Sequence, residues 1–335
     1  MINVKTVIKN SQILLLFVLL LCYIVIIGEI LIRIHTHFFD IYEVEMHKYA
    51  RRLKRESNVT GLTHEHVPNT EAVLMNVKVK INNMGFRDDY LQETKPADEY
   101  RILVIGSSMT MGWGVSFNSV YTTLLEKKLN LNTDKKYNVI NAGIGNYNAS
   151  MVSIYLKMIA TVVKPDKVIF HYYLNDVELI SPKKANWMVK NSYFIALIYS
   201  RILEAYFTKS VKYNSIGEYY YNLYDDSNKG WLSAQDAIRD IKKYCQNNNI
   251  SFMIMIQPDL HDFSNGSYQA KCHEKIRLFL EKEGIEYLDI FSAFRNKLKN
   301  NPQELWVSKD DPHVNVAGHR IIYEALSEYL ANSLR

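Results

Sequence analysis

Ser108 and His313 are the two residues whose types and surroundings could perform nucleophilic catalysis. Ser108 follows an apolar run at residues 102–105, which is typical of a buried strand and places the serine at the carboxyl end of that strand. A serine hydroxyl becomes a good nucleophile when a neighbouring base removes its proton. His313 lies in the segment SKDDPHVNVAGHR, and its Nε2 could be that base if a carboxylate accepts the proton on Nδ1.

Asp310 is our candidate for the carboxylate, because it precedes His313 by three residues with Pro312 between them. Asp311, one residue nearer to the histidine, is the competing candidate. By itself an Asp-x-x-His segment is ordinary, since caps and surface ion pairs have the same spacing. His319 stands at the start of a predicted helix, and we interpret it as a structural group.

Two further polar sites could stabilise the negative charge that develops on a substrate oxygen. Gly143 in VINAGIGNYN offers a backbone N–H group, and Asn175 in HYYLNDVE offers a side-chain amide. Taken singly, each is an ordinary turn residue. Because the carboxyl ends of parallel strands lie along one edge of a sheet, these sites, Ser108 and the histidine segment are predicted to face one crevice.

The pattern around these residues predicts an α/β fold, because apolar strands alternate with amphipathic helices. This alternation favours βαβ units and a three-layer α/β/α sandwich with a mostly parallel sheet. The predicted strands are at 101–105, 137–142, 167–173, 250–257 and 285–289, and the predicted helices at 118–130, 148–163, 233–247, 268–283 and 316–333. Residues 178–231 interrupt the alternation. We interpret them as an insertion that covers the sheet edge, with a substrate-groove wall and a membrane-lying helix as the alternatives.

The amino-terminal part predicts one transmembrane signal anchor at residues 13–34. From Ile13 to Ile32 there are 20 residues, about one hydrocarbon thickness of helix. No small-x-small cleavage site follows, so a retained anchor is favoured over a removed signal peptide. Lys5 and Lys9 favour a cytoplasmic tail at 1–12 and an extracytoplasmic catalytic domain, although a basic cluster at residues 48–55 opposes that orientation.

A stalk or lead-in segment is predicted at 35–99, between the anchor and a catalytic domain at 100–335. A helix is expected over 43–55 and a half-exposed strand over 77–81. The segment NNMGFRDD after that strand is typical of a turn, where Gly85 can adopt positive φ.

The composition argues against several other classes of protein. The formal net charge of +5 is modest, and no long basic run is interleaved with aromatic residues, so we expect no nucleic-acid partner. Neither GxGxxG nor GxxxxGK[ST] occurs. The cysteines, Cys22, Cys245 and Cys272, lack CxxC or metal-type spacing, so no disulfide framework is expected, while a single Cys245–Cys272 bridge stays open. We expect neither a metal nor an organic cofactor.

The order and spacing of these segments resemble the SGNH superfamily of GDSL-type esterases and lipases. Residues 105–110, IGSSMT, resemble the first block, with Ser108 as nucleophile. Asn141-Ala142-Gly143, Leu174-Asn175-Asp176 and Asp310-Asp311-Pro312-His313 resemble the later blocks, and the resemblance covers about residues 100–333. It implies the SGNH hydrolase fold with a flavodoxin-like sheet, a Ser108–His313–Asp310 triad, and an oxyanion hole made by Ser108, Gly143 and Asn175.

Two departures from the family pattern concern neighbours of the catalytic groups. Ser107 replaces the usual aspartate of GDS, and Tyr173 replaces the usual glycine before x-Asn-Asp. Neither change removes a group of the predicted triad or oxyanion hole.

The function that we predict is that of a single-pass membrane serine esterase. It would hydrolyse O-acyl esters, with O-acetyl groups on an extracytoplasmic glycan or a small ester as substrates, through an acyl-serine intermediate. Two alternatives stay open. One is an O-acyltransferase of an envelope polysaccharide pathway that uses the same triad, and the other is a non-catalytic glycan-binding or assembly protein.

Overall fold

The chain is described by a computed structural model that covers residues 4–131, 133–180, 186–210, 213, 215–264, 266–298 and 301–333. These residues form two compact units, with a boundary after Arg51. The first contains α1 (Val4–Phe38), most of α2 (Tyr42–Arg52), α6 (Trp187–Asn191) and α7 (Tyr193–Ser210). The second contains the remaining helices and strands. Of the predicted insertion at 178–231, residues 181–185, 211–212 and 214 lie outside the described residues.

A five-stranded, fully parallel sheet forms the centre of the second unit. In spatial order its strands are β6 (Lys136–Gly143), β5 (Glu99–Gly106), β7 (Lys167–Tyr173), β8 (Ser251–Gln257) and β9 (Glu286–Asp289). Numbered along the chain, the strand order is 2-1-3-4-5, which is that of flavodoxin-like sheets. In such sheets the strand order reverses beside the first strand. The predicted α/β class, the parallel sheet and the strand positions are confirmed.

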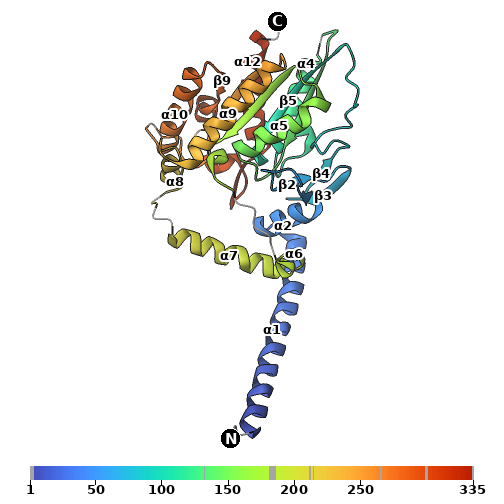
Figure 1. The fold of residues 1–335 in the computed structure, drawn as a ribbon, viewed down its shortest axis with the longest axis vertical. Coiled ribbons are helices and arrows are strands. Elements are labelled where there is room, and N and C mark those ends of the chain that lie inside the picture. Colours follow the sequence, from blue (N-terminus) through green and yellow to red (C-terminus); the bar gives the residue numbers. More distant parts are fainter. Residues whose placement is uncertain are drawn as a thin grey trace. The chain divides into compact units, whose positions relative to one another are not determined.

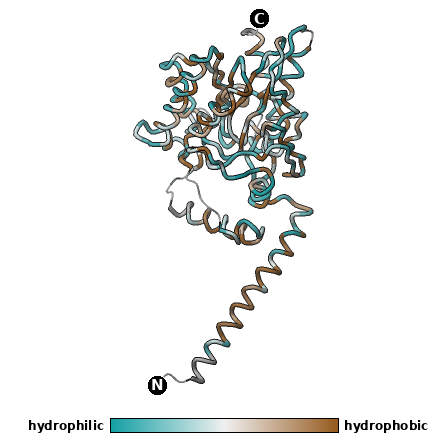
Figure 2. The backbone as a smooth tube through the Cα atoms, turned by 45° about the vertical axis from the view of Figure 1, so that its right-hand side comes forward, coloured by the Kyte–Doolittle hydropathy of each residue, from teal (hydrophilic) through white to brown (hydrophobic). Residues whose placement is uncertain are grey.

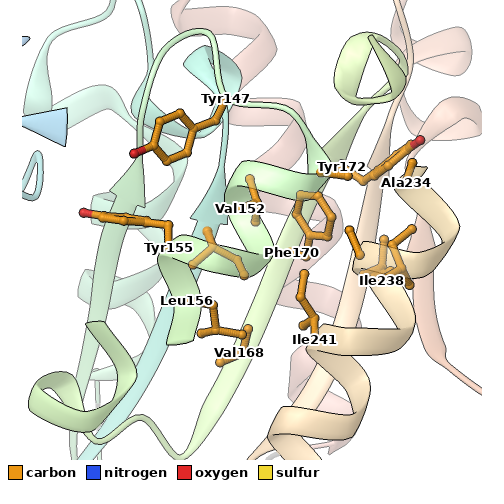
Figure 3. Packing of buried hydrophobic residues seen from close by; sticks show 14 of the residues in the cluster. Tyr147, Val152, Tyr155, Leu156, Val168, Phe170, Tyr172, Ala234, Ile238 and Ile241 are labelled. Atoms are coloured by element: carbon orange, nitrogen blue, oxygen red, sulfur yellow. The ribbon is translucent and has the colours of Figure 1, made fainter. Parts of the chain in front are cut away.

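Helices cover both faces of this sheet and complete a three-layer sandwich (Figure 1). One face is covered by α5 (Ala149–Val163), α9 (Lys229–Asn247) and α10 (Tyr268–Lys282), which packs against α8 (Ile216–Leu223). The other is covered by α4 (Tyr121–Leu129), α11 (Phe291–Lys297) and α12 (Val316–Ser333). Figure 3 shows the first face, where Leu156 and Ile238 pack beside Phe170 of β7. Each strand therefore has apolar neighbours on both sides, which explains its unbroken apolar run.

Short elements connect and extend this sandwich. Two hairpins follow α2 along the chain and precede β5. They are formed by β1 (Lys54–Glu56) with β2 (His64–His66) and by β3 (Thr70–Leu74) with β4 (Val77–Ile81). A third hairpin joins β10 (Trp306–Ser308) to β11 (Asp311–Val314). The short helical turns are α3 (Ser108–Met111), η1 (Phe117–Ser119), η2 (Leu174–Val177) and η3 (Pro302–Leu305).

The structure corrects the boundary between the predicted stalk and the catalytic domain. Residues 52–99, which we assigned to the stalk, belong to the same compact unit as the sheet. The expected helix at 43–55 ends at Arg52, because the chain then forms β1, and Leu53 between them is fully buried. The lead-in is therefore part of the α/β unit and is not a spacer.

Helix α1 has the length and composition of a membrane span. Its stretch Asn10–Phe38 is apolar, and only 6% of the most apolar part of this stretch is buried within the protein. Figure 2 shows this helix as a long hydrophobic segment. A single-pass membrane anchor is compatible with these features. Cys22 is exposed on this helix, and Cys245 and Cys272 are buried free thiols, so the Cys245–Cys272 bridge does not form.

Candidate active site

Ser108 lies at the carboxyl end of the central strand β5. The strand ends at Gly106, and Ser108 is the first residue of the single-turn helix α3. Gly112 ends that turn in a left-handed conformation with φ 80°, which glycine adopts without a steric penalty. This abrupt change from strand to turn leaves the Ser108 hydroxyl at the edge of the sheet, as the sequence predicts.

The Ser108 hydroxyl contacts His313, which is 205 positions further along the chain. Ser108 Oγ lies 2.8 Å from His313 Nε2, and His313 Nδ1 lies 2.5 Å from Asp311 Oδ1. The histidine and the aspartate both belong to β11. The three side chains thus form an unbroken series of hydrogen bonds from a buried carboxylate to a serine hydroxyl, which is the arrangement of a nucleophilic triad.

The predicted partner of His313 is corrected from Asp310 to Asp311. Asp311 is fully buried, and its Oδ1 accepts hydrogen bonds from both the backbone N–H and the Nδ1 of His313. Such a two-residue Asx arrangement needs the aspartate at the second position before the histidine. Asp310 is exposed in the tight turn between β10 and β11.

Asp311 also receives a hydrogen bond from the nucleophile segment itself. Trp113 Nε1 donates to Asp311 Oδ2 over 2.8 Å, and Trp113 is almost fully buried. Burial opposes ionisation of Asp311, but the hydrogen bonds and charge of His313 and the Trp113 bond outweigh it and hold the carboxyl pKa below its usual value. The carboxylate is therefore ionised at neutral pH and can stabilise a protonated His313.

Asn175 lies in η2 at the end of β7, the strand that pairs with β5. Asp176 Oδ2 accepts from the backbone N–H of Tyr173 over 2.9 Å and so holds the turn closed. Burial raises the pKa of the Asp176 carboxyl well above its usual value. Among the described residues, neither the buried Oδ1 nor the Nδ2 of Asn175 has a hydrogen-bond partner, so the amide group is available to a substrate.

Gly143, by contrast, does not offer the N–H group that we predicted. Its N–H donates to Asn141 Oδ1 over 3.1 Å. A Cβ at this position would lie 2.3 Å from the backbone nitrogen of Met111, so glycine is needed for the close packing of β6 against α3. This residue shapes the nucleophile turn, and we withdraw it from the oxyanion hole.

Arg87 is a supporting residue of the site that the sequence analysis missed. Its guanidinium is buried and donates to the carbonyl oxygens of Met111 (2.9 Å), Gly112 (2.5 Å) and Val115 (2.5 Å). These carbonyls follow the nucleophile turn. Arg87 comes from the segment NNMGFRDD, in which Asn82 Oδ1 accepts from two backbone N–H groups. The lead-in therefore holds the loop that carries Ser108.

A second aspartate–histidine pair lies at the end of β8. His261 Nδ1 lies 2.6 Å from Asp259 Oδ1, and the backbone N–H of His261 donates to the same oxygen, as in the Asp311–His313 pair. Tyr173, one of the two departures from the family pattern, donates its hydroxyl to Asp259 Oδ2 over 2.7 Å. Burial lowers the pKa of His261, but Asp259 outweighs this effect and the net shift is upward. The repeated Asp-x-His spacing was the signal that could have revealed this pair.

The other departure, Ser107, and the remaining histidine take no part in the triad. The Ser107 hydroxyl is buried and has no hydrogen-bond partner among the described residues. His319 is fully buried, stacks on Tyr121 and accepts from its backbone N–H, in agreement with the structural role expected for it. Within the described ranges, no group of three or more His, Cys, Asp or Glu side chains is arranged to hold a metal.

Comparison with known proteins gives similarity at the level of three-dimensional structure. No protein-family model and no curated protein matches the sequence. TesA has 13% identity and a TM-score of 0.45, with 69% of this chain and 98% of the other covered. A putative lipolytic protein of the G-D-S-L family from Desulfitobacterium hafniense has 14% identity and a TM-score of 0.41, with coverages of 68% and 98%.

A catalytic mutant of Axe2, an acetylxylan esterase from Geobacillus stearothermophilus, has 16% identity and a TM-score of 0.44. The similarity covers 71% of this chain and 95% of the Axe2 chain. The structural neighbours include esterases. At these identities and TM-scores they carry no argument about the activity of this chain, which rests on the geometry of its own site.

Arg87 generates a prediction about stability. Arg87→Met removes the hydrogen bonds to three carbonyls and leaves them buried, so we expect the free energy of unfolding to fall by at least about 2 kcal/mol. Arg55→Met is the matched control, because among the described residues the exposed Arg55 side chain forms an ion pair with Glu65 alone, and its loss should cost less than about 1 kcal/mol. Denaturant unfolding of the detergent-solubilised protein measures both. Equal losses in the two variants would contradict the role of Arg87.

Proposed function

We propose that this protein is a serine esterase that is tethered to a membrane by α1. The observation that carries the proposal is the continuous series Ser108 Oγ, His313 Nε2 and Nδ1, and Asp311 Oδ1, with distances of 2.8 and 2.5 Å. A serine in this setting can lose its proton to the histidine as it attacks a carbonyl carbon. The ionised Asp311 then stabilises the imidazolium that forms.

The negative charge on the substrate oxygen is stabilised by hydrogen-bond donors at the same edge of the sheet. We assign this role to the backbone N–H of Ser108 and the side-chain amide of Asn175. Loss of one such donor raises the reaction barrier by about 3–4 kcal/mol. His313 returns the proton to the leaving alcohol, and water then releases the acyl group from Ser108. A sugar hydroxyl in place of water would make the same intermediate serve acyl transfer, but no feature of the described residues favours that acceptor.

The proposed location is the extracytoplasmic face of a membrane, with the amino terminus in the cytoplasm. Lys5 and Lys9 precede the apolar stretch of α1 and support this orientation through the positive-inside rule. Because a domain on that face meets acylated polysaccharides, we extend the proposal to O-acetyl groups of an envelope glycan as substrates.

Ser108→Ala tests the esterase proposal directly. The variant lacks the nucleophile, so we expect hydrolysis of p-nitrophenyl acetate to fall by at least about a thousandfold in kcat. Ser107→Ala is the matched control, since the neighbouring hydroxyl contacts none of the triad groups and its loss should leave kcat unchanged. Undiminished turnover by the Ser108 variant would refute the proposal, and so would a loss confined to the Ser107 variant.

Replacement of the two adjacent aspartates separates their roles. Asp311→Asn should lower kcat by about ten-thousandfold, because the carboxylate that orients and stabilises His313 is lost. Asp310→Asn should leave kcat unchanged, because that side chain is exposed in the hairpin turn. The same ester assay measures both, and the opposite ranking would restore Asp310 as the partner of His313.

A further inference from the structure

Helix α7 begins on α1, close to the end of the apolar stretch of that helix. Glu29 Oε2 accepts hydrogen bonds from Ser192 Oγ over 2.7 Å and from the backbone N–H of Phe194 over 3.0 Å. The ring of Phe194 packs against the bare backbone of Gly28, where a Cβ would lie 2.7 Å from the ring. These contacts fix the start of α7 beside Gly28 and Glu29 of α1.

Gly28 and Glu29 would lie near the edge of a bilayer that α1 spans. The apolar run from Ile13 to Ile32 matches one hydrocarbon thickness, and Glu29 lies about 5 Å before its end at a rise of 1.5 Å per residue. Glu29 is also paired with Arg33. A hydrogen-bonded ion pair of this kind belongs near the lipid headgroups, where the cost of a charge falls.

Two side chains of α2, the helix that follows the apolar stretch, contact one side of α7. Arg201 of α7 forms an ion pair with Glu43 of α2 over 3.0 Å, and the rings of Tyr193 and His47 meet edge to face at 5.4 Å. Figure 1 shows α7 extending to one side from the upper end of α1, where α2 also lies. Because α2 comes after the predicted span, it marks the aqueous side of α7.

The opposite side of α7 exposes apolar and aromatic side chains. Ile198, Tyr199, Ile202 and Leu203 are all exposed, and Ile202 has a relative accessibility of 62%. Their spacing places them on one helical face, and Tyr199 and Arg201 are separated by about 200° around the axis. A contiguous apolar face of this kind is typical of a surface that contacts protein or lipid.

We propose that α7 lies on the bilayer surface with this face inserted at the boundary between headgroups and acyl chains. Interfacial helices bury their apolar faces by about 5–10 Å, which agrees with the depth of Glu29. Trp187 of the preceding helix α6 is 77% exposed, and tryptophan and tyrosine are enriched at such boundaries. The inference rests on the proposed membrane anchor and adds a second, lateral contact, which fixes the membrane-proximal unit against the bilayer.

Spin labels on the full-length protein in liposomes of phosphatidylcholine and phosphatidylglycerol test this placement. In a Cys22→Ala background, whose other cysteines are buried, a nitroxide is attached at Ile202→Cys or at Ser200→Cys. Ser200 is the matched control, because it lies about 200° around the helix from Ile202. We expect the label at position 202 to collide with lipid-soluble oxygen several-fold more, and with an aqueous nickel chelate several-fold less, than the label at position 200.

Each other outcome overturns a defined part of the proposal. Equal nickel accessibility at both positions would place the apolar face in water, and shielding of position 202 from both reagents would show that protein covers it. A label at Leu19→Cys reports on the anchor itself. If that label is reached by nickel, the membrane span fails, whereas oxygen contact at position 19 with nickel contact at position 202 refutes only the interfacial helix.

Discussion

The buried carboxylate of Asp311 is the group on which the geometry of the site depends. One oxygen accepts from the backbone and ring of His313, and the other accepts from Trp113, five positions after Ser108. The carboxylate thus joins the hairpin that carries the base to the loop that carries the nucleophile. Since a buried carboxylate without partners is costly, these three donors also keep it ionised and fixed in one orientation.

The segment before the sheet is a second constraint on the same loop. Arg87 binds carbonyls that follow the nucleophile turn, and Asp88 Oδ2 accepts from the backbone N–H of Asn141 in β6. Lys54, at the start of β1, donates to the carbonyl of Gly145 and to Asn146 in the loop after β6. The lead-in therefore supports two of the loops at the carboxyl edge of the sheet. Its folding is coupled to the site, and it cannot act as a passive spacer.

The regular part of the fold follows from local signals in the sequence. The strand at 167–173 and the helix at 316–333 were predicted with the bounds that the structure shows, because apolar periodicity and flanking polar residues mark them clearly. The strand at 77–81 was predicted with its observed bounds, but its partner β3 was missed. The strands of the other two hairpins were also missed, since strands of three or four residues give no measurable period. The assignment of α7 to the unit that contains α1 depends on contacts such as Glu29 with Phe194, which span 165 positions and leave no local pattern.

The site was predictable in its residue types and less so in its individual contacts. Ser108 and Asn175 lie where the ends of the predicted strands place them, whereas His313, for which no strand was predicted, belongs to β11. Spacing alone could not rank Asp310 and Asp311, because the choice depends on which carboxylate the hairpin turns inward. Gly143 has the position of an oxyanion donor in the sequence, but the Asn141 side chain takes its N–H group.

The central claim is that one serine of this chain is activated by the Asp311–His313 pair, and mapping the site of a fluorophosphonate adduct tests it most directly. Labelled full-length protein would be digested and the modified peptide sequenced by mass spectrometry. The account predicts a single adduct, on Ser108, and its disappearance when His313 is replaced by alanine. An adduct on Ser107 or on any serine outside α3, or labelling of Ser108 that persists without His313, would contradict it.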